Sequence, residues 1–151
     1  ILERKVVIFS LNNEDYGVGV EQVNSIERVA PITRVANVPS FVKGVINLRG
    51  VVTPVIDLRK RFDMPSKDYD GATRIVIVQV EDIQVGLIVD AVRDVLDISA
   101  YSIEEPPSGL GAVDVRYLAG VAKLEDRLLV LLNLDQVLSQ EEVNQLETVE
   151  S

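Results

Sequence analysis

The sequence contains no histidine and no cysteine among its 151 residues. The absence of imidazole and thiol groups excludes Ser-His-Asp and Cys-His nucleophiles, imidazole acid–base catalysis, disulfides, iron–sulfur clusters and ordinary zinc sites. Carboxylate, lysine, serine or magnesium chemistry remains open, as does a function without catalysis. We expect a non-enzymatic binding protein with no catalytic residue, no cofactor and no metal site.

Long apolar segments are also absent. The longest apolar run, Leu128–Leu132, is far shorter than the ~20 residues with which a helix crosses a bilayer. No charged segment followed by an apolar stretch resembles a signal peptide. We therefore expect a cytoplasmic protein without direct membrane insertion.

Positive charge is scarce. Acidic residues outnumber basic residues by 24 to 15, which gives a net charge of -9. This charge repels a phosphate backbone, so nucleic-acid binding would require a local basic patch. The one basic run, Arg59–Arg61, has no aromatic platform beside it and is more typical of a solvated face. We expect no nucleic-acid partner.

The chain contains an internal repeat. When Lys5–Ile26 is set against Arg74–Val95 without a gap, every apolar position of the first segment meets an apolar residue of the second. A second pair, Phe41–Phe62 and Tyr117–Leu138, follows in the same order and matches almost as well. Two matches in the same order indicate a duplication.

The repeat predicts one domain, 1–151, made of two homologous subdomains. We expect them to span about 1–68 and 72–138, joined by the polar stretch 67–71, with edge strands that could be exchanged between them. Each copy is rich in short β-branched segments and predicts a small barrel or curled sheet of four or five strands. Because so short a chain buries little surface, the two copies should pack together.

Two hairpins and two strand segments carry the all-β prediction. Dense apolar runs predict strands buried on both faces at Val6–Leu11 and Arg74–Val80. Paired apolar segments around a short polar turn predict hairpins. The first hairpin joins Val45–Leu48 to Val51–Ile56, and the second joins Val121–Leu124 to Leu128–Leu132.

Few helices are expected. Asp57 can cap a short helix over Leu58–Phe62, and Ser139 opens a capping box ahead of a C-terminal helix over 139–149. The segment Ala100–Arg116 contains Pro and Gly clusters and predicts a mobile surface loop.

Three local features suggest a site. Asp57 ends an apolar strand as the phosphoacceptor of a receiver domain does, but the alternative is a helix cap, because Asn12 and Asn13 stand where a receiver has an acidic pair. Gly109–Gly111 could open a phosphate-binding loop, yet no helix or lysine follows. Arg49, beside Gly50 in a hairpin turn, is either a solvated residue or an interface anchor.

A longer pattern contains Arg49. The segments Phe41–Gly50 and Val52–Arg59 resemble the central motif of the CheW family, the adaptor proteins of bacterial chemotaxis. The resemblance extends over about residues 6–138. It also includes Tyr16–Val18, Thr33–Val35, Gly86–Asp90 and Leu128–Leu134.

The resemblance implies a fold and a function. Members of this family have two pseudo-symmetric five-stranded SH3-like β-barrels packed side by side, and they are not enzymes. They couple the cytoplasmic tips of chemoreceptors to the histidine kinase CheA by docking on its regulatory domain. The resemblance thus implies a cytoplasmic adaptor recruited to membrane-bound receptor arrays. An acidic barrel that binds RNA or ribosomal protein, or a phosphoacceptor at Asp57, is the alternative.

The resemblance also implies interaction residues. Arg49 matches the family arginine needed for assembly of the signalling complex, and Asn47 and Gly50 match its neighbours. Val23 falls at a family contact position. Many members have glutamate two residues later. This chain has Ser25 at that position. The contact role of the family glutamate is therefore either absent or carried by Glu27.

A groove between two barrels could bind an amphipathic receptor helix. The candidate lining residues are Val23, Val45 and Val89, each of which could equally belong to the core.

Overall fold

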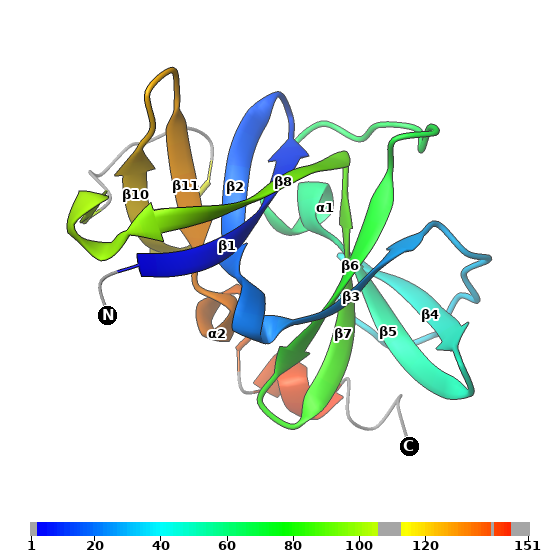
Figure 1. Cartoon of the computed structure of the whole chain (residues 1–151). Helices are drawn as coiled ribbons and strands as arrows, with labels where there is room; N and C mark the ends of the chain where they lie inside the picture. Colours follow the sequence, from blue (N-terminus) through cyan, green and yellow to red (C-terminus); the bar gives the residue numbers. More distant parts are fainter. Residues whose placement is uncertain (1–2, 106–112, 140, 146–151) are drawn as a thin grey trace.

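The computed structural model describes residues 3–105, 113–139 and 141–145, and its fold is all-β, as predicted (Figure 1). The strands form two sheets, of six and five strands. Sheet A contains, in spatial order, β8 (Ala91–Ser99), β1 (Glu3–Leu11), β2 (Glu14–Gly19), β11 (Leu128–Leu132), β10 (Leu118–Lys123) and β9 (Ile103–Glu104). Sheet B contains β3 (Val23–Arg28), β6 (Arg74–Val80), β7 (Ile83–Val89), β5 (Val51–Asp57) and β4 (Val42–Leu48).

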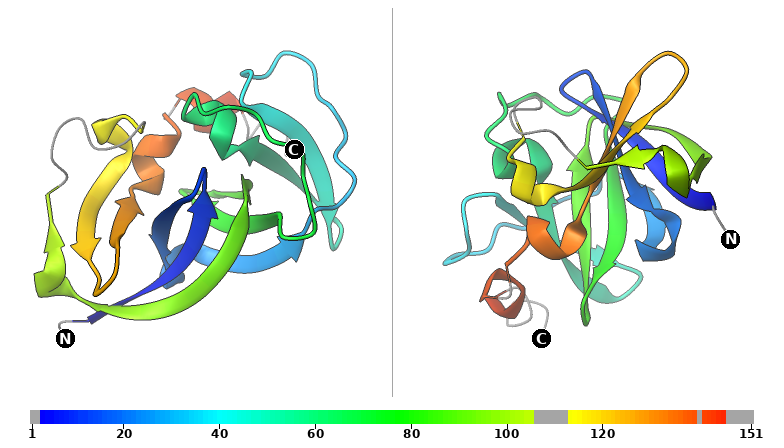
Figure 2. Two further views of the ribbon diagram at one scale, coloured as in Figure 1. Left: turned by 90° about the horizontal axis from the view of Figure 1, so that it is seen from above. Right: turned by 90° about the vertical axis from the view of Figure 1, so that its left-hand side faces the viewer.

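Short helices connect the strands. They are η1 (Val20–Gln22), α1 (Leu58–Arg61), η2 (Ala100–Ser102), η3 (Val115–Tyr117) and α2 (Leu134–Val137), followed by a C-terminal helix over 141–145. Figure 2 shows α1, α2 and the C-terminal helix together on one side of the molecule, where the two sheets meet. The rest of the predicted C-terminal helix and the candidate loop Gly109–Gly111 lie outside the described residues.

The sheets do not follow the division of the sequence near residue 70. Sheet B takes its hairpin β6–β7 from the second repeat, and sheet A takes its hairpin β1–β2 from the first. In both sheets the exchanged hairpin is central, whereas an exchange of edge strands was expected. The physical units are therefore 23–89 and, together, 3–19 and 91–132. A central position lets the buried strands β1 and β6 pair on both sides.

Each sheet also curls until its two edges are formed by neighbouring parts of the chain. In sheet A, β8 continues through η2 into β9, which pairs with β10 at Val121 and Ala122. In sheet B, Thr33, which follows β3, forms a two-residue bridge with Val45 of β4. These matching closures indicate two curled sheets of the same plan. The SH3-like barrel type stays a prediction.

The repeat is visible in individual hydrogen bonds. The Asp57 side chain caps α1 by accepting from the Arg59 amide at 3.0 Å, and Asn133 caps α2 by accepting from the Asp135 amide at 3.1 Å. The backbone amides of Asp57 and Asn133 both donate at 2.9 Å, to the carbonyls of Phe41 and Tyr117. Each partner is displaced by the same number of residues, which supports the duplication inferred from the apolar pattern.

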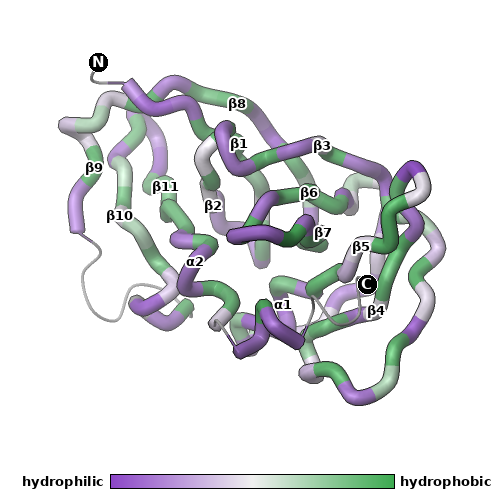
Figure 3. Tube along the Cα trace, turned by 90° about the horizontal axis from the view of Figure 1, so that it is seen from below, coloured by the Kyte–Doolittle hydropathy of each residue, from purple (hydrophilic) through white to green (hydrophobic). Residues whose placement is uncertain are grey.

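Among the described residues, three apolar clusters hold the fold together. One fills the space between the sheets and includes Phe9, Tyr16 and Leu58, and the other two lie inside the individual sheets around Ile8 and Ile77. Figure 3 shows the apolar residues concentrated along the strands. β1 and β6 contribute to two clusters each, which explains the dense apolar runs predicted to be buried on both faces.

The helix and hairpin predictions are largely confirmed. Ser139 and Glu142 form the predicted capping box, with backbone-to-side-chain bonds of 2.8 and 3.1 Å. The segment Ala100–Arg116 is a correction, because its described part holds η2, β9 and the start of η3 instead of a wholly irregular loop. Its apolar residue Ile103 packs against the core of sheet A, which fixes this part of the segment.

Candidate protein-interaction surfaces

The hairpin between β4 and β5 ends in a tight two-residue turn. Arg49 and Gly50 have φ angles of 49° and 86°, the left-handed combination of a type I′ turn. The Asn47 side chain accepts a hydrogen bond of 2.8 Å from the Gly50 amide and so fixes the turn from inside the hairpin. The turn holds Arg49 at the tip of the β4–β5 hairpin, where its side chain is 69% exposed.

Arg49 contacts the opposite edge of the same sheet. Its Nη2 atom lies 3.1 Å from Oε2 of Glu27 in β3, and the Glu27 side chain is 25% exposed. Because β3 and the β4–β5 hairpin stand at the two ends of the strand order, this ion pair exists only because the sheet curls. The pair leaves most of the guanidinium free for a partner carboxylate.

Ser25 lies beside this ion pair. The pKa of the Glu27 carboxyl is below its ordinary value, because the Ser25 hydroxyl and then the Arg49 guanidinium stabilise the carboxylate. The Ser25 Oγ atom is nevertheless shielded from solvent and reaches full hydrogen-bond geometry with no group among the described residues. In the described part of the chain, the contact of Glu27 that meets this geometry is the one with Arg49. A shielded hydroxyl cannot make a direct contact with a partner.

The three candidate valines occupy different places. Val23 is half-buried at the margin of the cluster between the sheets. Val45 is half-buried and forms the backbone bridge that closes sheet B. Val89 is 1% exposed and belongs to the core, so its assignment to a groove is corrected. It ends β7 of sheet B, on the face of that strand that packs against the cluster between the sheets.

Sequence reasoning missed two more exposed apolar residues. Ile26 in β3 is 41% exposed and Val95 in β8 is 46% exposed. Their strand partners, Val76 and Val7, belong to the cluster between the sheets, so both side chains point toward its border. Val23 and Val92 pack against the same cluster. We call these four residues, two on β3 and two on β8, the apolar margin.

The internal repeat of the sequence could have revealed the residues of the apolar margin. The ungapped alignment of Lys5–Ile26 with Arg74–Val95 places Val23 on Val92 and Ile26 on Val95. A register shift interrupts each of the two strand pairs nearby, between Val23 and Ser25 in sheet B and opposite Val92 in sheet A. The apolar margin is thus built from equivalent positions in the two repeats.

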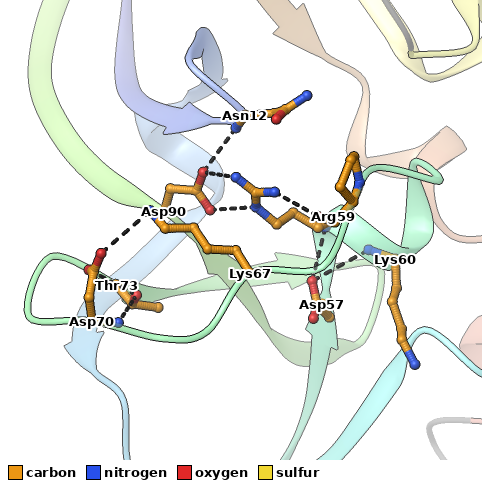
Figure 4. A network of polar contacts seen from close by, with 9 residues as sticks. Asn12, Asp57, Arg59, Lys60, Lys67, Asp70, Thr73 and Asp90 are labelled. Carbon is orange, nitrogen blue, oxygen red and sulfur yellow. Dashed lines mark hydrogen bonds and ion pairs between the residues drawn. The ribbon is translucent and has the colours of Figure 1, made fainter.

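The basic run Arg59–Arg61 is not the solvated face that its sequence suggested. Arg59 forms a bidentate pair with Asp90, and Arg61 forms one with Glu142 (Figure 4 for Arg59). The Arg59 and Arg61 side chains are 12% and 15% exposed. Because internal carboxylates neutralise both guanidiniums, the run does not form a basic patch for nucleic acid.

Asp57 has a structural role. Its Oδ1 atom accepts from the backbone amides of Arg59 and Lys60, and the same role falls to Asn133 at the equivalent helix. An amide cannot accept a phosphoryl group, so the shared feature of the two positions is helix capping. This supports the capping interpretation of Asp57 over the phosphoacceptor interpretation.

Comparison with known proteins agrees with these features. The family model for the CheW-like domain matches residues 5–142. The chain belongs to this family. It is 42% identical to the chemotaxis protein CheW of Bacillus subtilis over 137 residues, which cover 91% of this chain and 88% of that protein. It is 39% identical to the chemotaxis protein CheW of Klebsiella aerogenes over 140 residues, covering 93% and 84%.

A solved structure supports the fold. The crystal structure of the scaffolding protein TtCheW from Thermoanaerobacter tengcongensis superposes with a TM-score of 0.85 at 36% identity, covering 94% of this chain and 92% of that one. The family assignment made from the Asn47–Gly50 motif is therefore confirmed, and it places the chain among chemotaxis scaffold proteins. Within the described residues, no helix has the length and hydropathy of a membrane span.

Proposed function

We propose that this protein is a non-enzymatic adaptor that couples the cytoplasmic tips of chemoreceptors to the histidine kinase CheA. The observation that carries the proposal is the presentation of Arg49. Its guanidinium is 69% exposed at the end of a rigid turn and is oriented by Glu27. Arginine held in this way is a typical anchor for a partner carboxylate.

The backbone of Arg49 supports the same conclusion. At a φ of 49° the turn favours asparagine, aspartate or glycine, and arginine is a costly choice there. Nothing in the contacts of sheet B requires an arginine at this tip, since the pair with Glu27 is exposed to solvent on one side. A residue that disfavours its own turn is expected where binding selects it.

The second surface fits the second partner. The apolar margin presents Val23, Ile26, Val92 and Val95 beside the cluster between the sheets. An amphipathic helix, such as one from a receptor coiled coil, could bury its apolar face there. The two surfaces would let one molecule hold kinase and receptor together. The protein would then act in the cytoplasm at membrane-bound receptor arrays.

Replacing Arg49 by glutamate tests the proposal. An exposed turn residue contributes about 0.5 kcal/mol to stability, so the melting temperature should remain close to that of the wild type. Loss of an interface anchor and repulsion of the partner carboxylate should cost about 2 kcal/mol, or roughly thirtyfold in affinity for the kinase. Receptor-dependent stimulation of kinase activity should fall accordingly.

The matched control is Arg34→Glu, which makes the same change of charge at an exposed arginine outside the hairpin. We expect this variant to stimulate the kinase normally. If Arg49→Glu melts normally and also stimulates normally, Arg49 is a solvated turn residue and the proposal fails. If both variants lose stimulation equally, net charge and not the Arg49 contact is responsible.

A further inference from the structure

The short helix α1 connects the two sheets. It directly follows β5 of sheet B, and Leu58 anchors it in the cluster between the sheets. The two arginines of the helix contact segments that lead into sheet A or follow it. The helix α1 lies on the same side of the molecule as α2 and the C-terminal helix (Figure 2).

Arg59 reaches the junction between the sheets. Its Nε and Nη2 atoms donate to the two carboxylate oxygens of Asp90 at 2.9 and 2.7 Å. Asp90 stands between β7 of sheet B and β8 of sheet A, and it also accepts from the Asn12 amide in the β1–β2 turn at 2.9 Å. Figure 4 shows the three residues in one network.

Arg61 reaches the helices that follow β11 of sheet A. Its Nε atom donates to the Val137 carbonyl of α2 at 2.7 Å, and its two Nη atoms donate to Glu142 at 3.1 and 2.9 Å. The guanidinium also lies over the rings of Phe41 and Tyr117, at 4.4 and 5.2 Å from their centroids. One side chain therefore joins sheet B, α2 and the C-terminal helix.

The equivalent helix lacks these groups. In the repeat, Arg59 and Arg61 of α1 correspond to Asp135 and Val137 of α2. Both helices keep the capping residue and the first buried leucine, so the helix itself does not require arginine. The two arginines are present in one copy alone, and each of them contacts a segment outside sheet B.

We propose that α1 is a clamp that fixes the orientation of sheet A relative to sheet B, with Arg59 and Arg61 as its two arms. The apolar cluster between the sheets supplies attraction without direction. A bidentate guanidinium–carboxylate pair holds both partners in one geometry. The clamp thereby sets the spacing of β3 and β8, which carry the two halves of the apolar margin.

The absence of cysteine allows a direct measurement of this orientation. Spin labels are attached at Asp82→Cys and Asp126→Cys, two exposed turn positions in sheet B and sheet A. Electron–electron double resonance then gives the distance distribution between the sheets in the full chain. We expect a clearly broader distribution after Arg59→Gln or Arg61→Gln. The matched control, Lys60→Gln, lies between them on the same helix with its side chain exposed, and should leave the distribution unchanged.

Hydrogen exchange separates the two arms. Arg59→Gln should accelerate amide exchange in the β1–β2 turn about tenfold, which corresponds to about 1.4 kcal/mol of local opening free energy. Arg61→Gln should have the same effect at 141–145. Glu142→Gln removes the carboxylate that pairs with Arg61 and should reproduce the exchange pattern of Arg61→Gln. This variant replaces Arg61→Gln in the test if the arginine variant folds poorly.

The consequence for signalling rests on the proposed adaptor function. A loosened clamp should weaken the ternary complex of receptor, adaptor and kinase about tenfold while binding to the isolated kinase domain changes little, because the Arg49 tip lies within sheet B alone. An unchanged distance distribution in both arginine variants overturns the clamp. A broadened distribution in a protein that binds neither receptor nor kinase keeps the clamp and refutes the adaptor function, so the two failures are distinguishable.

Discussion

The unit β4–β5–α1 in sheet B and the unit β10–β11–α2 in sheet A are copies of one plan, yet they differ where they meet solvent. The first hairpin closes in two residues with left-handed backbone at Arg49 and Gly50. The second closes in a four-residue loop, in which Leu124 donates to the Arg127 carbonyl at 2.8 Å. The two copies are therefore alike in their buried parts and differ at the exposed hairpin tips and on the surface of the helix.

The comparison shows that alignment does not make two tips equivalent. Arg49 aligns with Glu125, which suggests equivalent positions of opposite charge. In the structure Arg49 is directed by a tight turn and by Glu27, while Arg127, two residues beyond Glu125, is held by the Asp15 carboxylate at 2.9 Å. Only the first tip presents a preoriented, mostly exposed guanidinium.

The largest expected difference concerns a glycine in each copy. A Cβ atom at Gly44, where φ is 151°, would overlap the Thr33 carbonyl oxygen of the closing bridge. At Gly120 the nearest atom is a side-chain methyl, Ile103 Cγ2 at 2.7 Å, and the Glu104 carbonyl oxygen is farther away at 3.1 Å, so the overlap with backbone is smaller than at Gly44. Gly44→Ala should therefore cost about 3 kcal/mol of unfolding free energy, and Gly120→Ala only about 1–2 kcal/mol. Urea unfolding of both variants measures this, and equal losses would contradict the comparison.

The Arg59–Asp90 pair distinguishes α1 from α2 and should depend on pH. Burial alone would raise the Asp90 pKa, but the hydrogen bonds from Arg59 and the Asn12 amide outweigh it and hold the pKa below its ordinary value. A lowered carboxyl pKa stabilises the fold above the unfolded-state pKa, and this contribution disappears as the pH falls through the folded-state value.

Asp90→Asn should thus lower stability by about 2 kcal/mol at neutral pH. Its deficit relative to the wild type should shrink as the pH falls below about 4. Thermal melts of both proteins across this range provide the measurement. A deficit independent of pH would show that the carboxylate charge contributes nothing.

A smaller loss of stability is expected when the side chain that fixes the tight turn is removed. Asn47→Ala removes the acceptor of the Gly50 amide and should cost about 1 kcal/mol. The aligned residue of the other copy, Lys123, makes only an exposed ion pair with Glu104 at 3.3 Å, so Lys123→Ala should cost less than about 0.5 kcal/mol. Chemical denaturation measures the loss of unfolding free energy in each variant. A larger loss for Lys123→Ala than for Asn47→Ala would contradict the distinction between the two hairpin tips.

The smallest effect has the opposite sign. Asparagine suits the left-handed backbone at position 49, so Arg49→Asn should stabilise the protein by about 0.5 kcal/mol while it weakens kinase binding. Gain of stability with loss of binding is the pattern of a residue selected for contact. A variant that melts higher and binds normally would mean that the tip has no partner.

Local chemistry made much of this fold readable from the sequence. The dense apolar runs gave the strands β1 and β6, Asp57 and Ser139 marked helix starts, and the motif Asn47–Gly50 indicated the family. These features depend on neighbours within a few residues, where propensity and capping decide the structure. The duplication was also visible, because the apolar pattern of a core survives divergence.

Contacts between distant segments could not be read in the same way. The exchange of β1–β2 and β6–β7 between the sheets, the contact of Arg49 with Glu27 and the pairs formed by Arg59 and Arg61 join residues far apart in the chain. The sequence by itself determined an all-β, duplicated member of the CheW-like family. Tertiary structure decided which strands share a sheet and which charges are free, since both depend on the curl of each sheet and on packing across the cluster between them.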